Sequence, residues 1–158
     1  QLSENISNIQ FVIAAAGHKI GDIYFDNSDL FGGIASTTPF EKNHITVPLT
    51  TIDYEIQKRN LAPPYLIKLD THGFETAILK GALESLVNTN IVIIESYNFH
   101  ISENSLKFYE ICSYMEQLGF SPIDIVDLLN REYDNSLWQM DIVFIRSNSN
   151  EFSYNKYK

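Results

Sequence analysis

The feature that most constrains the fold is a strand, a loop, a helix and a second strand that follow one another in the middle of the chain. Tyr65–Leu69 is a short apolar segment, and Gly73 marks a sharp turn into a helix expected over Phe74–Val87. Ile91–Ile94 is an unbroken apolar run, which is typical of a strand covered by helices on both faces. Strands joined through a helix are expected to lie parallel. Because ligands of such sheets bind outside the carboxyl ends of the strands, the unit predicts an open α/β sheet with a crevice at Leu69–Glu75.

Further strands and helices are predicted from apolar periodicity and from the turn residues that bound them. Ile9–Ala16 and Gly21–Phe25, which a short glycine-bounded turn separates, are expected to form a hairpin. Asp26–His44 is rich in residues typical of loops and is interpreted as one. Turn residues also separate the last two strands, which are therefore expected to be antiparallel. The remaining strands are predicted at Ile45–Leu49, Ser121–Asp127 and Met140–Arg146, and the remaining helices at Asp53–Arg59 and Ser105–Leu118.

The length of 158 residues suits one domain with a single core. A hydrophobic content of 44% and a charged content of 20% are typical of a globular protein. We expect residues 1–146 to form this domain and residues 147–158 to form a polar, frayed tail. The formal net charge of −9 argues against a nucleic-acid surface and against docking on anionic lipid, so neither is an expected partner.

The number of cysteines gives a weak indication of the cellular compartment. Cys112 is the only cysteine, so the 158 residues form no internal disulfide, which fits a reducing compartment such as the cytoplasm. It stands in a helical apolar pattern and is expected to be a buried structural thiol. No apolar run approaches the ~20 residues that a membrane-spanning helix needs.

Polar side chains stand where the two central strands end. Asp70 follows the first strand, where a carboxylate could accept a proton, orient a hydroxyl or bind a cation. Equally, it could cap the helix that follows, because aspartate accepts hydrogen bonds from free backbone N–H groups. His72 carries an imidazole, which can exchange a proton near neutrality, although an exposed loop histidine is the simpler interpretation. Asp70 and His72 are the candidate catalytic residues.

Four neighbouring residues are candidates for contact with a substrate or a cofactor. Gly73 permits a tight turn and the close approach of a ligand. Glu75 stands in the first helical turn, where the helix dipole favours a carboxylate, so a structural role is at least as well supported as a catalytic one. Glu95 ends an otherwise apolar strand and is expected either to face the site or to be paired, and Tyr97 could line the same opening.

Other constellations of residues are weak or missing. There is no Gly-x-Gly-x-x-Gly or Walker segment, no Gly-x-Ser-x-Gly elbow and no Cys-x-x-Cys pair. The four histidines lack the spacing of a zinc site, so no metal site is predicted. Lys68, within a core strand, is expected to pair with a carboxylate or to extend its ammonium group to solvent. Asp141 interrupts an apolar strand, where a solvated charge on an edge strand is the simplest interpretation.

Two central segments carry a resemblance to a known family. Leu66–Glu75 reads LIKLDTHGFE and Ile78–Ala82 reads ILKGA. Together they resemble the signature of FkbM-type methyltransferases, a Leu/Ile-Lys-Ile-Asp-x-x-Gly-x-Glu segment followed by Leu-Lys-Gly-Ala. The similarity runs from about Ile9 to Arg146. Three flanking segments resemble those of the family in the right order: Thr51–Asp53, Ile93–Glu95 and Gln139–Phe144.

The resemblance implies a Rossmann-like class I methyltransferase fold, with a mostly parallel sheet and an antiparallel C-terminal edge. It implies S-adenosylmethionine (SAM) as the cofactor and methyl transfer to a hydroxyl oxygen of a small molecule, such as a sugar or a polyketide-like acceptor. On this resemblance, Asp70 and His72 would contact the acceptor or act as the base, and Glu95 would shape the neighbouring wall.

One departure from the family pattern limits this expectation. The glycine-rich segment of the family, Asp-x-Gly-Ala-Asn-x-Gly, and the acidic residue that holds the cofactor ribose are absent from the 158 residues. We therefore expect the C-terminal part of a truncated fold, with a gap between its first strand and Tyr65–Leu69, and weak SAM binding at best. A truncated, non-catalytic α/β binding module stays open as an alternative, and a different α/β enzyme is disfavoured by its missing motifs. Self-association is a further option, since such a sheet would expose apolar edges.

Overall fold

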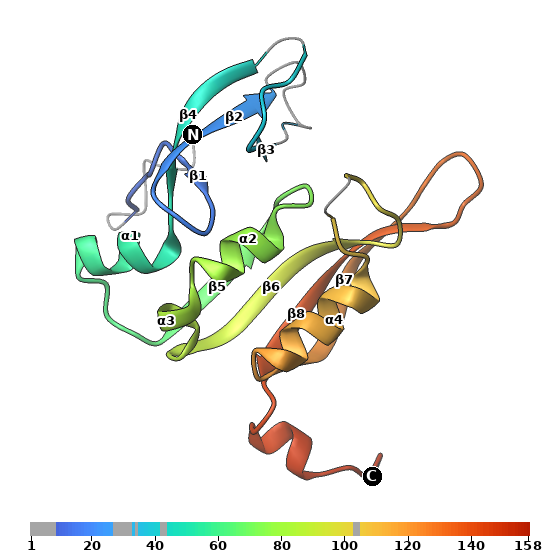
Figure 1. The fold of residues 1–158 in the computed structure, drawn as a ribbon. Helices are drawn as coiled ribbons and strands as arrows, with labels where there is room; N and C mark the ends of the chain where they lie inside the picture. The colour runs from blue at the N-terminus through green and yellow to red at the C-terminus, as the bar shows by residue number, and fades with distance from the viewer. Residues whose placement is uncertain (1–8, 27–32, 34, 42–43, 103–104) are drawn as a thin grey trace.

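The structure is a computed structural model and describes residues 9–26, 33, 35–41, 44–102 and 105–158. These residues form two four-stranded sheets with helices beside them (Figure 1). The first sheet has the order β1-β4-β2-β3 and consists of β1 (Ala15–Ala16), β2 (Gly21–Asp26), β3 (Ala35–Ser36) and β4 (His44–Thr50). The second has the order β5-β6-β8-β7 and consists of β5 (Tyr65–Leu69), β6 (Thr89–Tyr97), β7 (Phe120–Asn130) and β8 (Leu137–Arg146). The helices are α1 (Ile52–Arg59), α2 (Glu75–Lys80), α3 (Leu83–Leu86), α4 (Phe108–Gln117) and the 3-10 helix η1 (Asn150–Ser153).

Both sheets are mixed, so the expectation of a mostly parallel sheet is wrong. Each sheet contains one parallel pair, β1–β4 in the first and β5–β6 in the second, and two antiparallel pairs. The parallel pair β5–β6 follows from the crossover through α2 and α3. After β6 the chain forms α4 and β7 and then returns as β8, which lies between β6 and β7 and runs antiparallel to both. The α/β class and the antiparallel pairing of the last two strands are confirmed.

The N-terminal region differs most from the prediction. Only Ala15–Ala16 of the expected strand Ile9–Ala16 is β-structure, and Phe11 and Ile13 are 76% and 93% exposed. The reason is that β1 pairs only with Leu49–Thr50, so the residues before it lack a strand partner among the described residues. The expected hairpin of the first two strands is also wrong, because β4 lies between β1 and β2. The segment interpreted as a loop contains β3, although residues 27–32, 34 and 42–43 lie outside the described part.

The helix expected over Phe74–Val87 is interrupted at Gly81, where α2 ends and α3 follows. The carbonyl oxygen of Gly81 accepts a hydrogen bond from the Asp53 amide at 3.0 Å. The Asp53 carboxylate in turn accepts from the backbone amides of Glu84 and Ser85, at 3.1 and 2.8 Å. The free N–H groups at the start of α3 are thus satisfied from α1, which lets the chain begin a second helix there.

A close backbone contact joins α2 to the first sheet at the same point. A Cβ atom at Gly81 would lie 1.9 Å from the carbonyl oxygen of Gly17 and 3.1 Å from the Cβ of Thr51. Only a residue without a side chain permits this approach. Gly81 therefore fixes where the first sheet stands beside the second.

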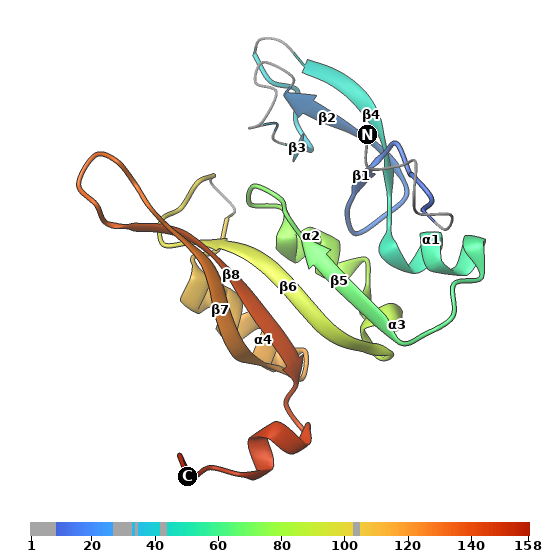
Figure 2. The same cartoon turned by 180° about the vertical axis from the view of Figure 1, so that it is seen from behind.

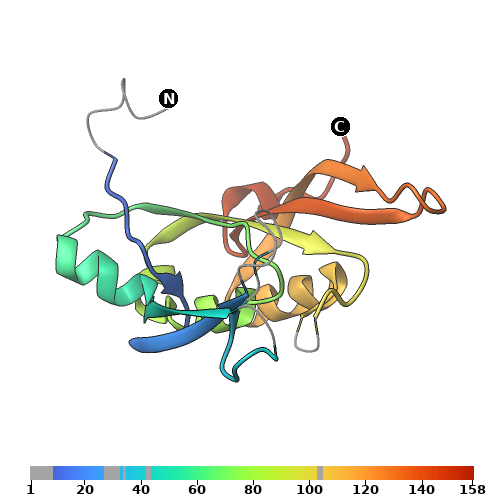
Figure 3. The ribbon, with the colours of Figure 1, turned by 90° about the horizontal axis from the view of Figure 1, so that it is seen from above.

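The main core lies between the second sheet and α2, α3 and α4, which Figures 1 and 3 show on one side of that sheet. Alternate residues of β5, β6 and β8 face this core, and the residues between them face the opposite side, which these helices leave open (Figure 2). From β7 only Phe120 belongs to the core. Cys112 packs partly buried against the core, and burial raises the pKa of its thiol. The core is built from these residues: Ile67, Leu69, Ile78, Leu79, Ala82, Leu86, Val92, Ile94, Ile111, Met115, Phe120, Met140, Ile142 and Phe144.

Two further observations concern the ends of the elements. The tail, expected to be frayed, contains the short 3-10 helix η1. The strand predicted at Tyr65–Leu69 and the short helix that precedes it are confirmed. No helix within the described ranges is long and apolar enough to cross a membrane.

Candidate functional site

A polar cluster occupies the open face of the second sheet, at the carboxyl ends of β5 and β6. Lys68 comes from β5, Glu95 and Tyr97 from β6, and Gln139 and Asp141 from β8. The register places Glu95 opposite Asp141 and Tyr97 opposite Gln139, so these side chains project from the same face. We call these five residues the polar cluster.

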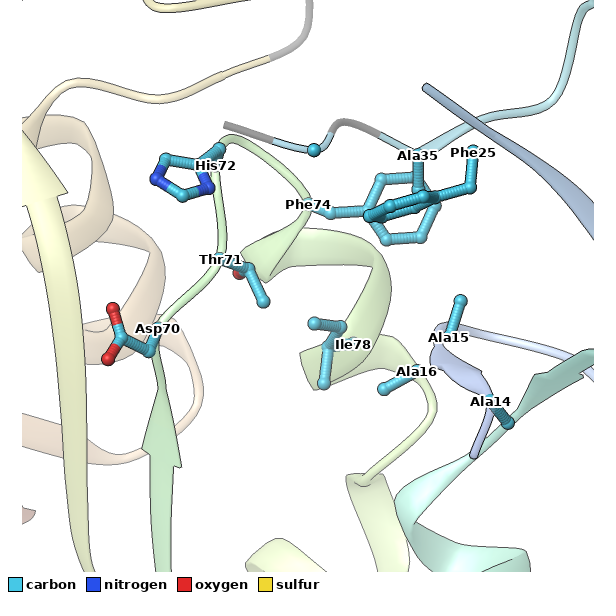
Figure 4. A pocket seen from close by; sticks show the side chains of 11 residues that line it. Ala14, Ala15, Ala16, Phe25, Ala35, Asp70, Thr71, His72, Phe74 and Ile78 are labelled. Carbon is cyan, nitrogen blue, oxygen red and sulfur yellow. The ribbon is translucent and has the colours of Figure 1, made fainter. Parts of the chain in front are cut away.

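The loop after β5 adds Asp70 and His72 to this cluster. Figure 4 shows both side chains turned toward β6, whereas the Thr71 side chain points the other way. The side chains of Asp70 and His72 are 63% and 36% exposed, so both are accessible to a ligand. The loop therefore presents two chemically different sides.

Glu95 is the central acceptor of the polar cluster. Its Oε1 accepts a hydrogen bond from the Tyr97 hydroxyl, and its Oε2 accepts from Nε2 of Gln139 at 2.7 Å. Nε2 of His72 lies 3.9 Å from Oε1 of the same carboxylate. Burial raises the pKa of Glu95, the hydrogen bond from Tyr97 opposes this rise, and the nearby Asp70 carboxyl adds to it.

Tyr97 is held in its protonated form. Burial raises the pKa of its hydroxyl well above the ordinary value, and the hydrogen bond to Glu95 and the negative charge of that carboxylate raise it further. Its ring lies 6.2 Å from the ring of His72 and 5.9 Å from that of Trp138, measured between centroids. At neutral pH the Tyr97 hydroxyl therefore stays protonated and donates its hydrogen bond to Glu95.

This shift predicts a pH dependence of stability. An unfolded tyrosine loses its proton near its ordinary pKa of 10.0, whereas folded Tyr97 keeps it. The stability that Tyr97 contributes is therefore present below about pH 10 and is lost as the pH rises toward the folded pKa. We expect the difference in melting temperature between the wild type and Tyr97→Phe to shrink from about pH 9 to about pH 11. Circular dichroism melts would measure it, and a constant difference over this range would contradict the assignment.

Lys68 lies between two carboxylates. Its Nζ donates a hydrogen bond to Oδ2 of Asp141 at 2.7 Å and lies 3.7 Å from Oδ2 of Asp70. Burial lowers the pKa of Lys68, but the hydrogen bond and the charge of Asp141 outweigh it and leave that pKa above its ordinary value. Asp141 is only 8% exposed, so its interpretation as a solvated edge charge is wrong; β8 is an inner strand of the sheet. The expected pairing of Lys68 with a carboxylate is confirmed.

Gly73 and Glu75 shape the turn that presents this loop. Gly73 has a φ of 89°, in the left-handed region that favours glycine. Oε1 of Glu75 accepts hydrogen bonds from the Gly73 amide and the Thr71 hydroxyl, both at 2.9 Å, and Glu75 is 4% exposed. Glu75 therefore supplies the turn with the hydrogen-bond acceptor that Asp70 could have provided, and Asp70 stays available on the side that faces β6.

A cavity of about 440 Å³ lies on the other side of this loop, between the second and the first sheet (Figure 4). In Figure 4 the Ala15 methyl group points toward the rings of Phe25 and Phe74, and the Ala16 methyl group points toward Ile78. Its volume falls within the roughly 300–1,000 Å³ that small-molecule sites occupy. The lining residues are Ala14, Ala15, Ala16, Phe25, Gly33, Ala35, Asp70, Thr71, His72, Phe74 and Ile78.

The structure thus brings together Asp70, His72, Glu95 and Tyr97, while Gly73 and Glu75 form the turn beside them. Phe25 was not predicted as a site residue, because only the strand pairing of the first sheet brings it to the cavity. Gln139 stood only within a resembling segment, and its contact with Glu95 depends on the register of β8. No group of three histidine, cysteine, aspartate or glutamate side chains within the described part could hold a metal ion.

The chain matches one family of known proteins. The family model described as the methyltransferase FkbM domain matches residues 2–122. This match includes β5, its loop and β6, but it ends within β7, so the segment Gln139–Phe144 lies outside it. No curated protein and no solved structure matches the chain significantly. Because the match spans well over half of the 158 residues, the chain belongs to the FkbM methyltransferase domain family.

Proposed function

We propose that this protein is part of a SAM-dependent methyltransferase that methylates a hydroxyl oxygen of a small molecule, such as a sugar or a polyketide-like acceptor. One observation supports the proposal within the family: the loop of Asp70 and His72 lines a small-molecule-sized cavity and also borders the polar cluster. A donor on one side and an acceptor on the other would meet at this loop. Such a position, outside the carboxyl end of β5, is where ligands of α/β sheets bind.

The cavity residues fit part of the cofactor. The methyl groups of Ala14–Ala16 and the rings of Phe25 and Phe74 suit a flat aromatic group such as adenine, and Thr71 adds a polar atom at the edge. The 158 residues contain no glycine-rich loop for the charged end of the cofactor. We therefore assign these residues to one wall of the SAM site. Bound SAM would supply an electrophilic methyl group on its sulfonium sulfur.

The residues of the chain have distinct roles in this proposal. His72 accepts the proton of the acceptor hydroxyl, which makes the oxygen a better nucleophile, a contribution of typically about 10²–10⁴-fold in rate. Asp70, which is exposed beside it, accepts a hydrogen bond from the acceptor and orients it. Glu95 faces Nε2 of His72 and stabilises the positive charge that the imidazole gains. A cytoplasmic location is included in the proposal because Cys112 is the only cysteine.

SAM binding and methyl transfer test this function. Calorimetry of the 158-residue chain should give a Kd of roughly 1 mM or weaker, corresponding to about −4 kcal/mol, because only one wall of the site is present. The gene product, with any residues that its gene encodes ahead of Gln1, should bind more tightly. It should also transfer a labelled methyl group from SAM to polyhydroxylated acceptors.

Two outcomes would count against these statements. Low-micromolar binding by the 158-residue chain would contradict the assignment of a single wall. Absence of methyl transfer from the gene product to every hydroxylated acceptor, with SAM bound, would favour the non-catalytic binding module.

A further inference from the structure

Two strands hold Glu95 from different sides. Tyr97 and Gln139 are partners in the register of β6 and β8, and each donates a hydrogen bond to a different oxygen of the Glu95 carboxylate. The Glu95 side chain is 12% exposed, so water has little access to compete for these oxygens. Both oxygens are therefore fixed by donors that themselves stand on inner strands of the sheet.

The fixed carboxylate faces only one nitrogen of His72. Oε1 of Glu95 lies 3.9 Å from Nε2, and an ionised carboxylate can only accept hydrogen bonds. The other titratable groups near Glu95 are Asp70, which shares the loop with His72, Tyr97, which already donates a hydrogen bond to Glu95, and Lys68 on β5. A proton on Nε2 is thus favoured, and Nδ1 is the nitrogen with a free lone pair.

We propose that Gln139 and Tyr97 are positioning residues that clamp Glu95 and thereby fix the His72 proton on Nε2, leaving Nδ1 to act as the base. In the reaction, the acceptor hydroxyl proton passes to Nδ1, and the imidazolium keeps its Nε2 proton toward Glu95. The inference of a base rests on the proposed function, whereas the inference of a clamp and a fixed tautomer does not. Gln139 lies outside residues 2–122, which match the family model.

Nitrogen-15 NMR of the imidazole rings in the 158-residue chain tests the clamp without an activity assay. His100 supplies an internal reference, because its Nδ1 lies 2.8 Å from the carbonyl oxygen of Ser105 and must carry the proton there. At a pH where His72 is neutral, we expect its proton on Nε2. Gln139→Met keeps the size of the side chain but removes the donor. Because the Glu95 carboxylate then loses one of the two donors that hold it toward Nε2, the ratio of the two tautomers should fall about tenfold.

Three controls separate the clamp from general damage. Gln117→Met, on the exposed surface of α4, should leave the His72 tautomer unchanged. Tyr97→Phe removes the other donor and should shift the tautomer ratio in the same direction as Gln139→Met. If Gln139→Met does not fold, Tyr97→Phe alone tests the clamp. The His100 signals should stay constant throughout. An unchanged His72 tautomer in folded Gln139→Met or Tyr97→Phe would overturn the clamp, whether or not the gene product transfers methyl groups.

Discussion

Asp70→Asn is expected to lower the turnover of the methyltransferase about 100-fold, which is the size of loss that a misplaced reactant can cause. The amide keeps the size of the side chain but replaces one acceptor oxygen by a donor, so the acceptor hydroxyl loses its alignment beside His72. Stability should change by no more than about 0.5 kcal/mol, because the Asp70 side chain is 63% exposed and its contact with Lys68 is 3.7 Å long.

Turnover measured with labelled SAM in the gene product, together with thermal melts, would separate these effects. Asp22→Asn provides the matched control, since Asp22 is an exposed aspartate on β2 and does not line the cavity. Turnover equal to that of the wild type would remove Asp70 from the mechanism. A loss of turnover that only accompanies a loss of folded protein would assign Asp70 a structural role.

Gly81→Ala is expected to lower the free energy of unfolding by about 3 kcal/mol, the upper end of what overpacking usually costs. The added Cβ would lie 1.9 Å from the carbonyl oxygen of Gly17 and 3.0 Å from its carbonyl carbon. These are backbone atoms, so the clash cannot be relieved by turning a side chain. One of the two sheets has to move, and the hydrogen bond from Asp53 to Gly81 is weakened as it does.

Urea unfolding of the 158-residue chain would measure this change. Lys80→Ala, one residue earlier on the exposed end of α2, should change stability by no more than about 0.5 kcal/mol. Equal stability of the wild type and Gly81→Ala would show that the first sheet is not held against α2 as described.

Local patterns predicted the second sheet well and the first sheet poorly. Tyr65–Leu69 and Ile91–Ile94 form strands whose alternate side chains pack against a helical layer, and that apolar pattern is local. The expectation of helices on both faces is wrong, because α2, α3 and α4 cover one face and leave the polar cluster on the other (Figure 3). Ile9–Ala16 has the same apolar character, yet strand formation needs a neighbour, and only Ala15–Ala16 has one in the described part. The failure there is one of pairing, which single-sequence periodicity does not contain.

The residues of the site also fall into those that local sequence predicts and those that depend on strand pairing. Asp70, His72 and Glu95 could be named in advance because they follow or end the strands of one local unit. The partners of Glu95 could not be named in advance. Gln139 is 44 positions away in the sequence and reaches Glu95 only because β8 pairs antiparallel with β6 in this register. Asp141 was misjudged for the same reason: β8 enters the sheet between β6 and β7 instead of adding to its edge.

The contact between Gly17 and Gly81 has a further consequence for the cavity. Phe25 and the alanines of one wall belong to the first sheet, and Phe74 and Ile78 of the other wall belong to the α2 side. The spacing of the walls is therefore set at a backbone contact that lies outside the lining residues. A single methyl group at position 81 would alter the distance across the cavity while leaving the chemistry of its surface the same, which makes this position a means of changing which ligand size the cavity accepts.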